Sequence, residues 1–136
     1  MQKIFRAFIG PTGFRTARVY EGGGESSHYG AFVCDALESD LQSAESCQEH
    51  LGHVMAVLRG ELDALDFSGN AYLIEVDRAA VTFSNQLTED KGGEISTYEY
   101  LSILGFWLKF FESGMEPVEG VIAENIEDAL VLTVRE

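Results

Sequence analysis

The sequence has only two cysteines, few basic residues and no long apolar run. Cys34 and Cys47 are too few for a disulfide framework and lack the paired spacing of a zinc ribbon, so we expect reduced thiols. No run of about 18 apolar residues is present, and no transmembrane helix is therefore expected. Residues 1–6 lack the apolar stretch and cleavage site of a signal peptide, which favours a cytoplasmic location.

The length of 136 residues fits a single domain covering residues 1–136, because two domains would each approach the lower size limit for an independent core. The hydrophobic fraction of 46% is normal for a globular protein and argues against extensive disorder. A domain of this size buries roughly two-thirds of its unfolded surface, so we expect it to fold alone.

Negative charge dominates the composition. The chain has 23 Asp and Glu against 9 Lys and Arg, which gives a formal net charge of −14. Long-range repulsion disfavours direct binding to nucleic acid or to an anionic membrane. The same field favours a basic protein partner, because electrostatic steering accelerates such encounters by roughly 10- to 1000-fold. The alternative is that the charge serves only to keep the protein soluble.

Several segments predict strands. Residues 3–9 are expected to form a strand that ends at a turn, and residues 14–20 can pair back on it. The short apolar run at residues 29–34 predicts a third strand. Further strands are predicted where apolar and polar residues alternate, at residues 71–77, 80–87, 118–123 and 129–134. The glycine-containing residues 91–93 predict a loop.

A first helix is predicted at about residues 36–59. Asp35 and Glu38 have the Asp-x-x-Glu spacing of a capping box, in which each side chain satisfies a free backbone donor. Gly60 provides a stop signal. Apolar residues recur at helical spacing along one stripe, namely Leu37, Leu41, Ala44, Leu51, Met55 and Leu58.

A second helix is predicted at about residues 97–112, with Ser96 and Glu99 as its capping box. Residues 103–111 are apolar on almost every side, so we expect this half to be covered on more than one face, with Trp107 in the core. The sequence therefore predicts the α+β class, with an antiparallel sheet of about five or six strands packed with two main helices.

No catalytic motif of any specificity is present. The three glycines at residues 22–24 lack the Gly-Lys-Ser/Thr ending of a phosphate-binding loop. Cys47, His50 and His53 are spaced three apart, but each step rotates the side chain by about 60° around a helix, which suits one metal ion poorly. We therefore predict no catalytic residue, no cofactor and no metal, and expect surface histidines beside a half-buried cysteine.

The acidic residues are clustered rather than interspersed with bases. Residues 19–58 and residues 110–134 contain no Lys or Arg. Glu45 and Glu49 are a like-charge i,i+4 pair, which costs roughly 0.2–0.5 kcal/mol on a helix. This pattern indicates a use for the negative field, although a solvated face without a binding role remains the alternative. The predicted partner-binding residues are Glu38, Asp40, Glu45, Glu49, Tyr29, Glu21 and Glu25, with Glu38, Glu45 and Glu49 on one helix face.

About a third of the chain has a recognisable pattern. Its residues are Ala71–Asp77, Val81–Asn85, Ile95–Ser96 and the helical Leu101, Leu104, Trp107 and Phe110. This pattern resembles small immunity proteins of contact-dependent growth inhibition and related polymorphic-toxin systems. The resemblance implies a bacterial cytoplasmic protein that binds and blocks the C-terminal toxin domain of a secreted effector, often a tRNase, another RNase or a DNase. It assigns no functional residue, because members bind their toxins through different surfaces.

Two other classes remain open. Type III secretion chaperones are also small, acidic and α+β, but they are usually dimeric and typically start with a helix rather than a strand. A small-molecule-binding enzyme domain requires a deep polar pocket with perturbed titratable groups. The function expected from charge and resemblance is a monomeric or weakly dimeric immunity protein, whose acidic surface covers the basic active-site cleft of a nuclease toxin.

Overall fold

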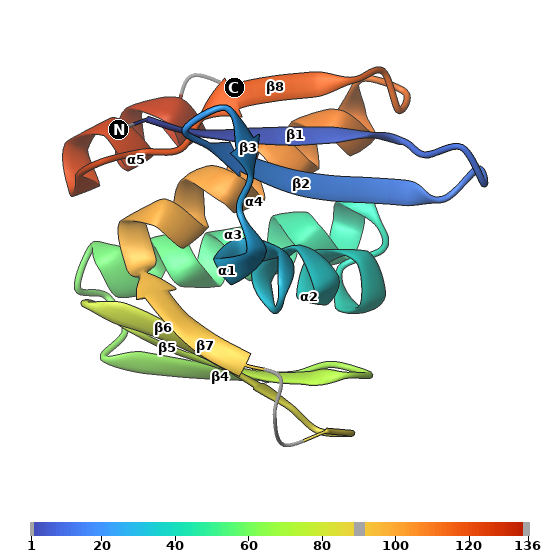
Figure 1. Cartoon of the computed structure of the whole chain (residues 1–136). Coiled ribbons are helices and arrows are strands. Elements are labelled where there is room, and N and C mark those ends of the chain that lie inside the picture. Colours follow the sequence, from blue (N-terminus) through green and yellow to red (C-terminus); the bar gives the residue numbers. More distant parts are fainter. Residues whose placement is uncertain (1, 89–91, 135–136) are drawn as a thin grey trace.

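The computed structural model describes residues 2–88 and 92–134. Two four-stranded antiparallel sheets enclose a layer of helices (Figure 1). Sheet A has the strand order β3-β2-β1-β8, and sheet B has the order β4-β5-β6-β7. The predicted α+β class is confirmed. The single sheet of five or six strands was wrong, because the described residues form two sheets of four strands each.

Sheet A is built on the predicted hairpin of β1 (Lys3–Ile9) and β2 (Arg15–Glu21). The short β3 (Gly24–Glu25) and β8 (Val118–Val121) flank it, and β8 confirms most of the strand predicted at residues 118–123. The side chains of the hairpin that face the helices have no exposed surface and are Phe5, Ala7, Ala17 and Val19.

The strand predicted at residues 29–34 is wrong, because the segment lies in α1 (Ser27–Gly30) and α2 (Val33–Asp40). A helix between two sheets is buried on several sides, so a short segment of its sequence is apolar at almost every position, like the sequence of a buried strand. The predicted capping box is also wrong, because Asp35 and Glu38 both lie within α2. The buried side chains recur at helical spacing and include Tyr29, Phe32, Val33, Ala36 and Leu37.

The predicted helix at residues 36–59 is interrupted. After α2 the chain turns, and α3 (Ala44–Leu58) begins with a new N-cap. The Ser43 side chain accepts a hydrogen bond from the Ser46 backbone N–H at 3.1 Å, which satisfies one of the free donors of the first turn. An apolar stripe that continues through the interruption made the two helices look like one.

Sheet B contains the predicted hairpin as β5 and β6, and also two strands that the sequence did not reveal. A loop was predicted at residues 91–93, but residues 92 and 93 belong to β7. Residue 91 lies outside the described residues. Gly93 approaches Phe32 so closely that an added Cβ would clash with the ring, so glycine suits the packing here. The strands are β4 (Ala64–Ser68), β5 (Tyr72–Asp77), β6 (Ala80–Asn85) and β7 (Gly92–Ser96).

Helix α4 (Thr97–Glu112) is the central element of the helical layer. Its capping box is confirmed, since Ser96 and Glu99 satisfy each other's backbone donors. It packs against strands of both sheets, as its apolar character predicted. Trp107 has no exposed surface, and its indole N–H donates to the Leu41 carbonyl at 2.8 Å, which ties α4 to the turn before α3.

The strand predicted at residues 129–134 is wrong, because the chain forms α5 (Ile126–Val134) there. Asn125 starts this helix by accepting the Asp128 backbone N–H on its side-chain oxygen at 2.8 Å. Acidic residues in the first turn stabilise it further through the helix dipole. No helix in the described part of the chain is long and apolar enough to cross a membrane.

Candidate functional site

Glu38, the first predicted binding residue, joins α2 to sheet A. Its Oε2 accepts the Ala17 backbone N–H at 2.8 Å and the Arg18 Nη1 at 3.1 Å. Arg18 also lies 3.6 Å from Oε2 of Glu25, measured from its Nε atom. These contacts neutralise two of the predicted acids and occupy a backbone donor of β2, so Glu38 stabilises the fold.

Asp40 is a second structural carboxylate. Its two oxygens accept the backbone N–H groups of Ala71 at 3.0 Å and Tyr72 at 2.9 Å, which fastens the end of α2 to the start of β5. Gly69 lies so close to this carboxylate that an added Cβ would clash with it. The negative charge of Asp40 is therefore used inside the molecule.

Tyr29 is only 3% exposed, so it offers almost no area to a partner. Its hydroxyl donates to Oε2 of Glu99 at 2.7 Å, and the same oxygen accepts from Lys3 Nζ at 2.7 Å. The hydrogen bond to Glu99 raises the pKa of Lys3 above its usual value. Burial opposes ionisation of Glu99, but hydrogen bonds from Lys3, Tyr29 and Ser96 hold its pKa below the usual range. Lys3 and Glu99 therefore form a stable ion pair, with Tyr29 as a further hydrogen-bond donor, at the edge of a cavity of about 570 Å³.

The predicted helix face of acids does not exist as one surface. Glu45 and Glu49 are exposed on α3, whereas Glu38 lies on α2 beyond the interruption. Glu21 is exposed at the end of β2, opposite Lys3 in the strand register. Within the described residues, the side chains of Glu21, Glu45 and Glu49 make no hydrogen bond or ion pair, so their charge is available to solvent or to a partner.

The perturbed titratable groups are not placed for acid–base chemistry near neutrality. Burial raises the pKa of Cys34 to about 12 and that of Cys47 to about 12. His50 is 2% exposed rather than a surface residue, its Nε2 lies 2.8 Å from the Tyr100 hydroxyl, and burial lowers its pKa to about 4. A general acid or base needs a pKa near the working pH. Among the described residues, no group of three His, Cys, Asp or Glu could hold a metal ion.

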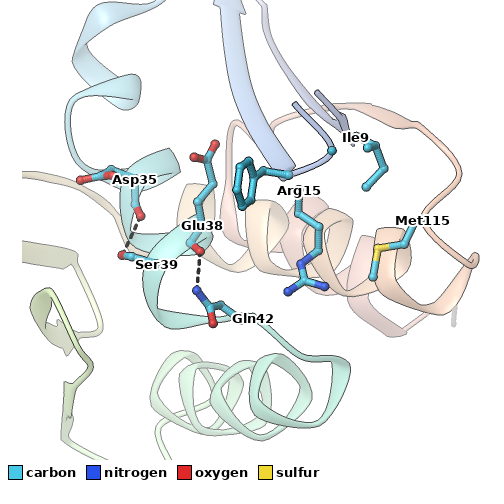
Figure 2. A pocket seen from close by; sticks show the side chains of 9 residues that line it. Ile9, Arg15, Asp35, Glu38, Ser39, Gln42 and Met115 are labelled. Atoms are coloured by element: carbon cyan, nitrogen blue, oxygen red, sulfur yellow. Dashed lines mark hydrogen bonds between the residues drawn. The ribbon is translucent and has the colours of Figure 1, made fainter. Parts of the chain in front are cut away.

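A groove of about 430 Å³ lies beside the tip of the β1–β2 hairpin. Figure 2 shows Asp35 and Glu38 on one side of it, Ile9 and Met115 on the other, and Arg15 between them. Phe14, also in the lining, is 72% exposed. Because apolar, acidic and basic side chains share this groove, its charge selects no particular ligand.

The outer face of sheet B carries a row of acids that crosses the strands. The strand register sets Asp66 opposite Glu75, Glu75 opposite Thr82, and Thr82 opposite Glu94. The three carboxylate side chains are exposed and make no hydrogen bond or ion pair within residues 2–88 and 92–134. Neighbouring strands lie about 4.7–4.9 Å apart, so Asp66 and Glu75 are one strand spacing apart, and Thr82 on β6 separates Glu75 from Glu94.

The first two acids of this row are especially close. Gly69 donates its backbone N–H to the Tyr72 carbonyl at 2.9 Å, which sets these two at a hydrogen-bonded position of the β4–β5 ladder, with the Tyr72 N–H donating to Asp40 in place of Gly69. Pair types alternate along an antiparallel ladder, so Asp66 and Glu75 form a non-hydrogen-bonded pair. Cα atoms in such pairs are about 4.5 Å apart, and their side chains lie close together.

The two sheets differ sharply in charge. Strands β1 and β2 carry four of the nine basic residues, and the outer face of sheet A pairs Arg6 Nε with Oε2 of Glu119 at 3.4 Å. The four strands of sheet B contain no Lys or Arg, and their acids are Asp66, Glu75, Asp77 and Glu94.

The row was not among the predicted binding residues, because β4 and β7 were not predicted as strands. The alternation at residues 64–68, with Leu65 and Phe67 on one face, was the available signal. Comparisons of the chain with protein-family models, with curated proteins and with solved structures find no match. The resemblance of residues 71–111 to immunity proteins therefore stays a prediction.

Proposed function

We propose that this protein binds and neutralises a basic protein partner, and that the outer face of sheet B is its acidic docking surface. The observation that carries the proposal is the row of Asp66, Glu75 and Glu94 on a sheet whose strands contain no base. Like charges directly opposite each other destabilise a sheet by roughly 0.2–1 kcal/mol per pair. A sheet optimised for stability alone would set a lysine against one of these acids.

The row resembles a nucleic-acid backbone in one physical respect, since it sets negative charges along a line, with Asp66 and Glu75 on adjacent strands and roughly 9–10 Å between the strands of Glu75 and Glu94. A nuclease presents a positively charged cleft to its substrate, and an acidic face can occupy that cleft through the same attraction. A toxin nuclease domain in the cytoplasm is therefore the proposed partner. The segment that resembles immunity proteins, residues 71–111, contains β5 to β7 and thus Glu75 and Glu94 of the row.

Co-expression tests this proposal. The proposed partner is the C-terminal domain of a large secreted protein, to be sought among the genes beside this one; that domain is induced with and without the chain, and the chain is expected to restore growth. The triple variant Asp66→Lys, Glu75→Lys, Glu94→Lys should lose this protection. A matched variant, Glu45→Lys, Glu49→Lys, Glu116→Lys, adds the same positive charge elsewhere and should keep it. Growth arrest that the unaltered chain does not relieve would contradict the proposal.

A further inference from the structure

Strand β4 forms an open edge of sheet B. Because Gly69 and Tyr72 lie at a hydrogen-bonded position of the ladder, Leu65 and Phe67 also direct their backbone groups toward β5. The alternate residues of β4 direct their backbone groups away from the sheet. The backbone N–H and C=O groups that point outward therefore belong to Ala64, Asp66 and Ser68.

This edge lacks three of the features that commonly block strand pairing. Proteins commonly protect an edge strand with lysine, with proline or with a bulge. β4 contains neither lysine nor proline, and its five residues pair with β5 without a register break. Its inward side chains Leu65 and Phe67 are only half-buried, whereas Ile74 opposite Phe67 is fully buried. One more strand beside β4 would cover both side chains.

The other sheet edges are less suitable. β7 lines a cavity together with His28 and Tyr29 of α1, so its edge faces another part of the molecule. β3 has only two residues. On β8, the Glu119 side chain is engaged by Arg6. β4 thus combines an open backbone edge with incompletely covered apolar side chains.

We infer that the basic partner adds a strand to β4, an inference that rests on the proposed function and specifies how the partner docks. A residue opposite Asp66 on an added strand would point to the same face as Asp66. A lysine or arginine at that position would continue the acidic row with an opposite charge, and apolar residues beside it would cover Leu65 and Phe67. The occupant is therefore an extended segment that alternates basic and apolar side chains.

A second copy of this chain fits the edge poorly. Symmetric antiparallel pairing centred on β4 would set Asp66 against Asp66 of the second copy, and each copy carries a formal net charge of −14. Like charges directly opposite each other are destabilising in a sheet. Asp66 therefore disfavours self-association while it attracts a cationic strand.

Amide hydrogen exchange with a synthetic peptide of alternating lysine and valine tests the inference. Binding is expected to slow exchange at Ala64, Asp66 and Ser68, whose N–H groups point outward. Exchange at Leu65 and Phe67, already bonded to β5, should change little. The same peptide with N-methyl groups on its pairing residues should bind at least about tenfold more weakly, because it lacks the donors of a β ladder. Equal binding of both peptides, or no slowing at the outward amides, would overturn strand addition.

Variants separate strand addition from simple charge attraction. Asp66→Asn removes the charge. Asp66→Pro removes the charge and also the outward N–H, and an edge strand tolerates proline at a position that makes no ladder hydrogen bond. Asp66→Pro should weaken peptide binding several-fold more than Asp66→Asn does. On the opposite edge, Glu94→Pro and Glu94→Asn should weaken peptide binding to the same extent. Equal effects of the two Asp66 variants would overturn strand addition and leave the proposed function standing. Concentration-dependent dimers of the unaltered chain that Asp66→Pro abolishes would show that a second copy occupies β4, and would also overturn the inference.

Discussion

Asp66 and Glu75 face each other across β4 and β5 as a non-hydrogen-bonded pair, on a sheet whose strands contain no Lys or Arg. Such an arrangement weakens the sheet through direct repulsion. In the proposed function, a cationic partner relieves this repulsion when it docks. The same pair therefore links the stability of the free protein to its binding.

Replacement of Glu75 by lysine should stabilise the free protein. The substitution turns the repulsive pair with Asp66 into an attractive one, worth roughly 0.2–1 kcal/mol. Urea unfolding at low salt measures the gain, which should shrink as salt screens the charges. Glu116→Lys, at an exposed position whose side chain has no described partner, changes the net charge equally and serves as the control. An equal gain in both variants would attribute the effect to net charge alone.

Glu99→Gln should destabilise the fold by about 1–3 kcal/mol at neutral pH, because Lys3 and Tyr29 lose their shared charged acceptor. The pKa of Glu99 is lower in the folded state than its usual 4.5. Its contribution is therefore complete above pH 4.5 and is lost as the pH falls through the folded value. Urea unfolding should show a difference between the two proteins at pH 7 that fades in acid. A constant difference at every pH would contradict the assignment.

His50 should make the protein less stable in mild acid. Burial lowers its pKa from 6.5 to about 4, with a smaller effect from His53, so the unfolded chain binds the proton more readily. Stability should be unaffected above pH 6.5 and fall as the pH drops toward 4, by up to about 3 kcal/mol. His50→Gln keeps a hydrogen-bonding group for Tyr100 and should flatten this part of the pH profile. Identical profiles for both proteins would show that His50 is not the responsible group.

The contact between Asp40 and Gly69 should appear as coupling between two substitutions. Asp40→Ala leaves the N–H groups of Ala71 and Tyr72 without their acceptor and should cost about 1–3 kcal/mol. Gly69→Ala should also destabilise, because its Cβ would clash with the Asp40 carboxylate. That clash is absent when Asp40 is alanine, so the double variant should lose less stability than the two losses added together. Strict additivity, measured by urea unfolding, would contradict the contact.

The sequence predicted elements whose signals are local. The Ser96 and Glu99 capping box located α4, and alternation located β5 and β6. Signals that depend on tertiary context failed. The run at residues 29–34 looked like a strand because a helix enclosed between two sheets is apolar on several sides. β7 was hidden by its two glycines, of which Gly93 packs against Phe32 and Gly92 against the Phe83 backbone.

The row of acids on sheet B was not among the residues that the sequence predicted for a binding surface. The excess of acids indicated a surface for a basic partner, yet spacing along the chain did not distinguish free carboxylates from those used internally. Glu38 and Asp40 accept backbone donors from distant strands, which only the fold brings within reach. The row of Asp66, Glu75 and Glu94 exists through strand register, so its members are far apart in sequence.

The association rate with the proposed basic toxin domain is the most direct measurement of the proposed acidic face. Asp66→Lys, Glu75→Lys, Glu94→Lys and its matched variant, Glu45→Lys, Glu49→Lys, Glu116→Lys, both raise the formal net charge from −14 to −8, since each of the three substitutions adds two positive units. At low salt, stopped-flow mixing should show association slowed by about tenfold or more for the first variant and far less for the second. Equal slowing in the two variants would mean that total charge, rather than the face of sheet B, attracts the partner, and would contradict the account.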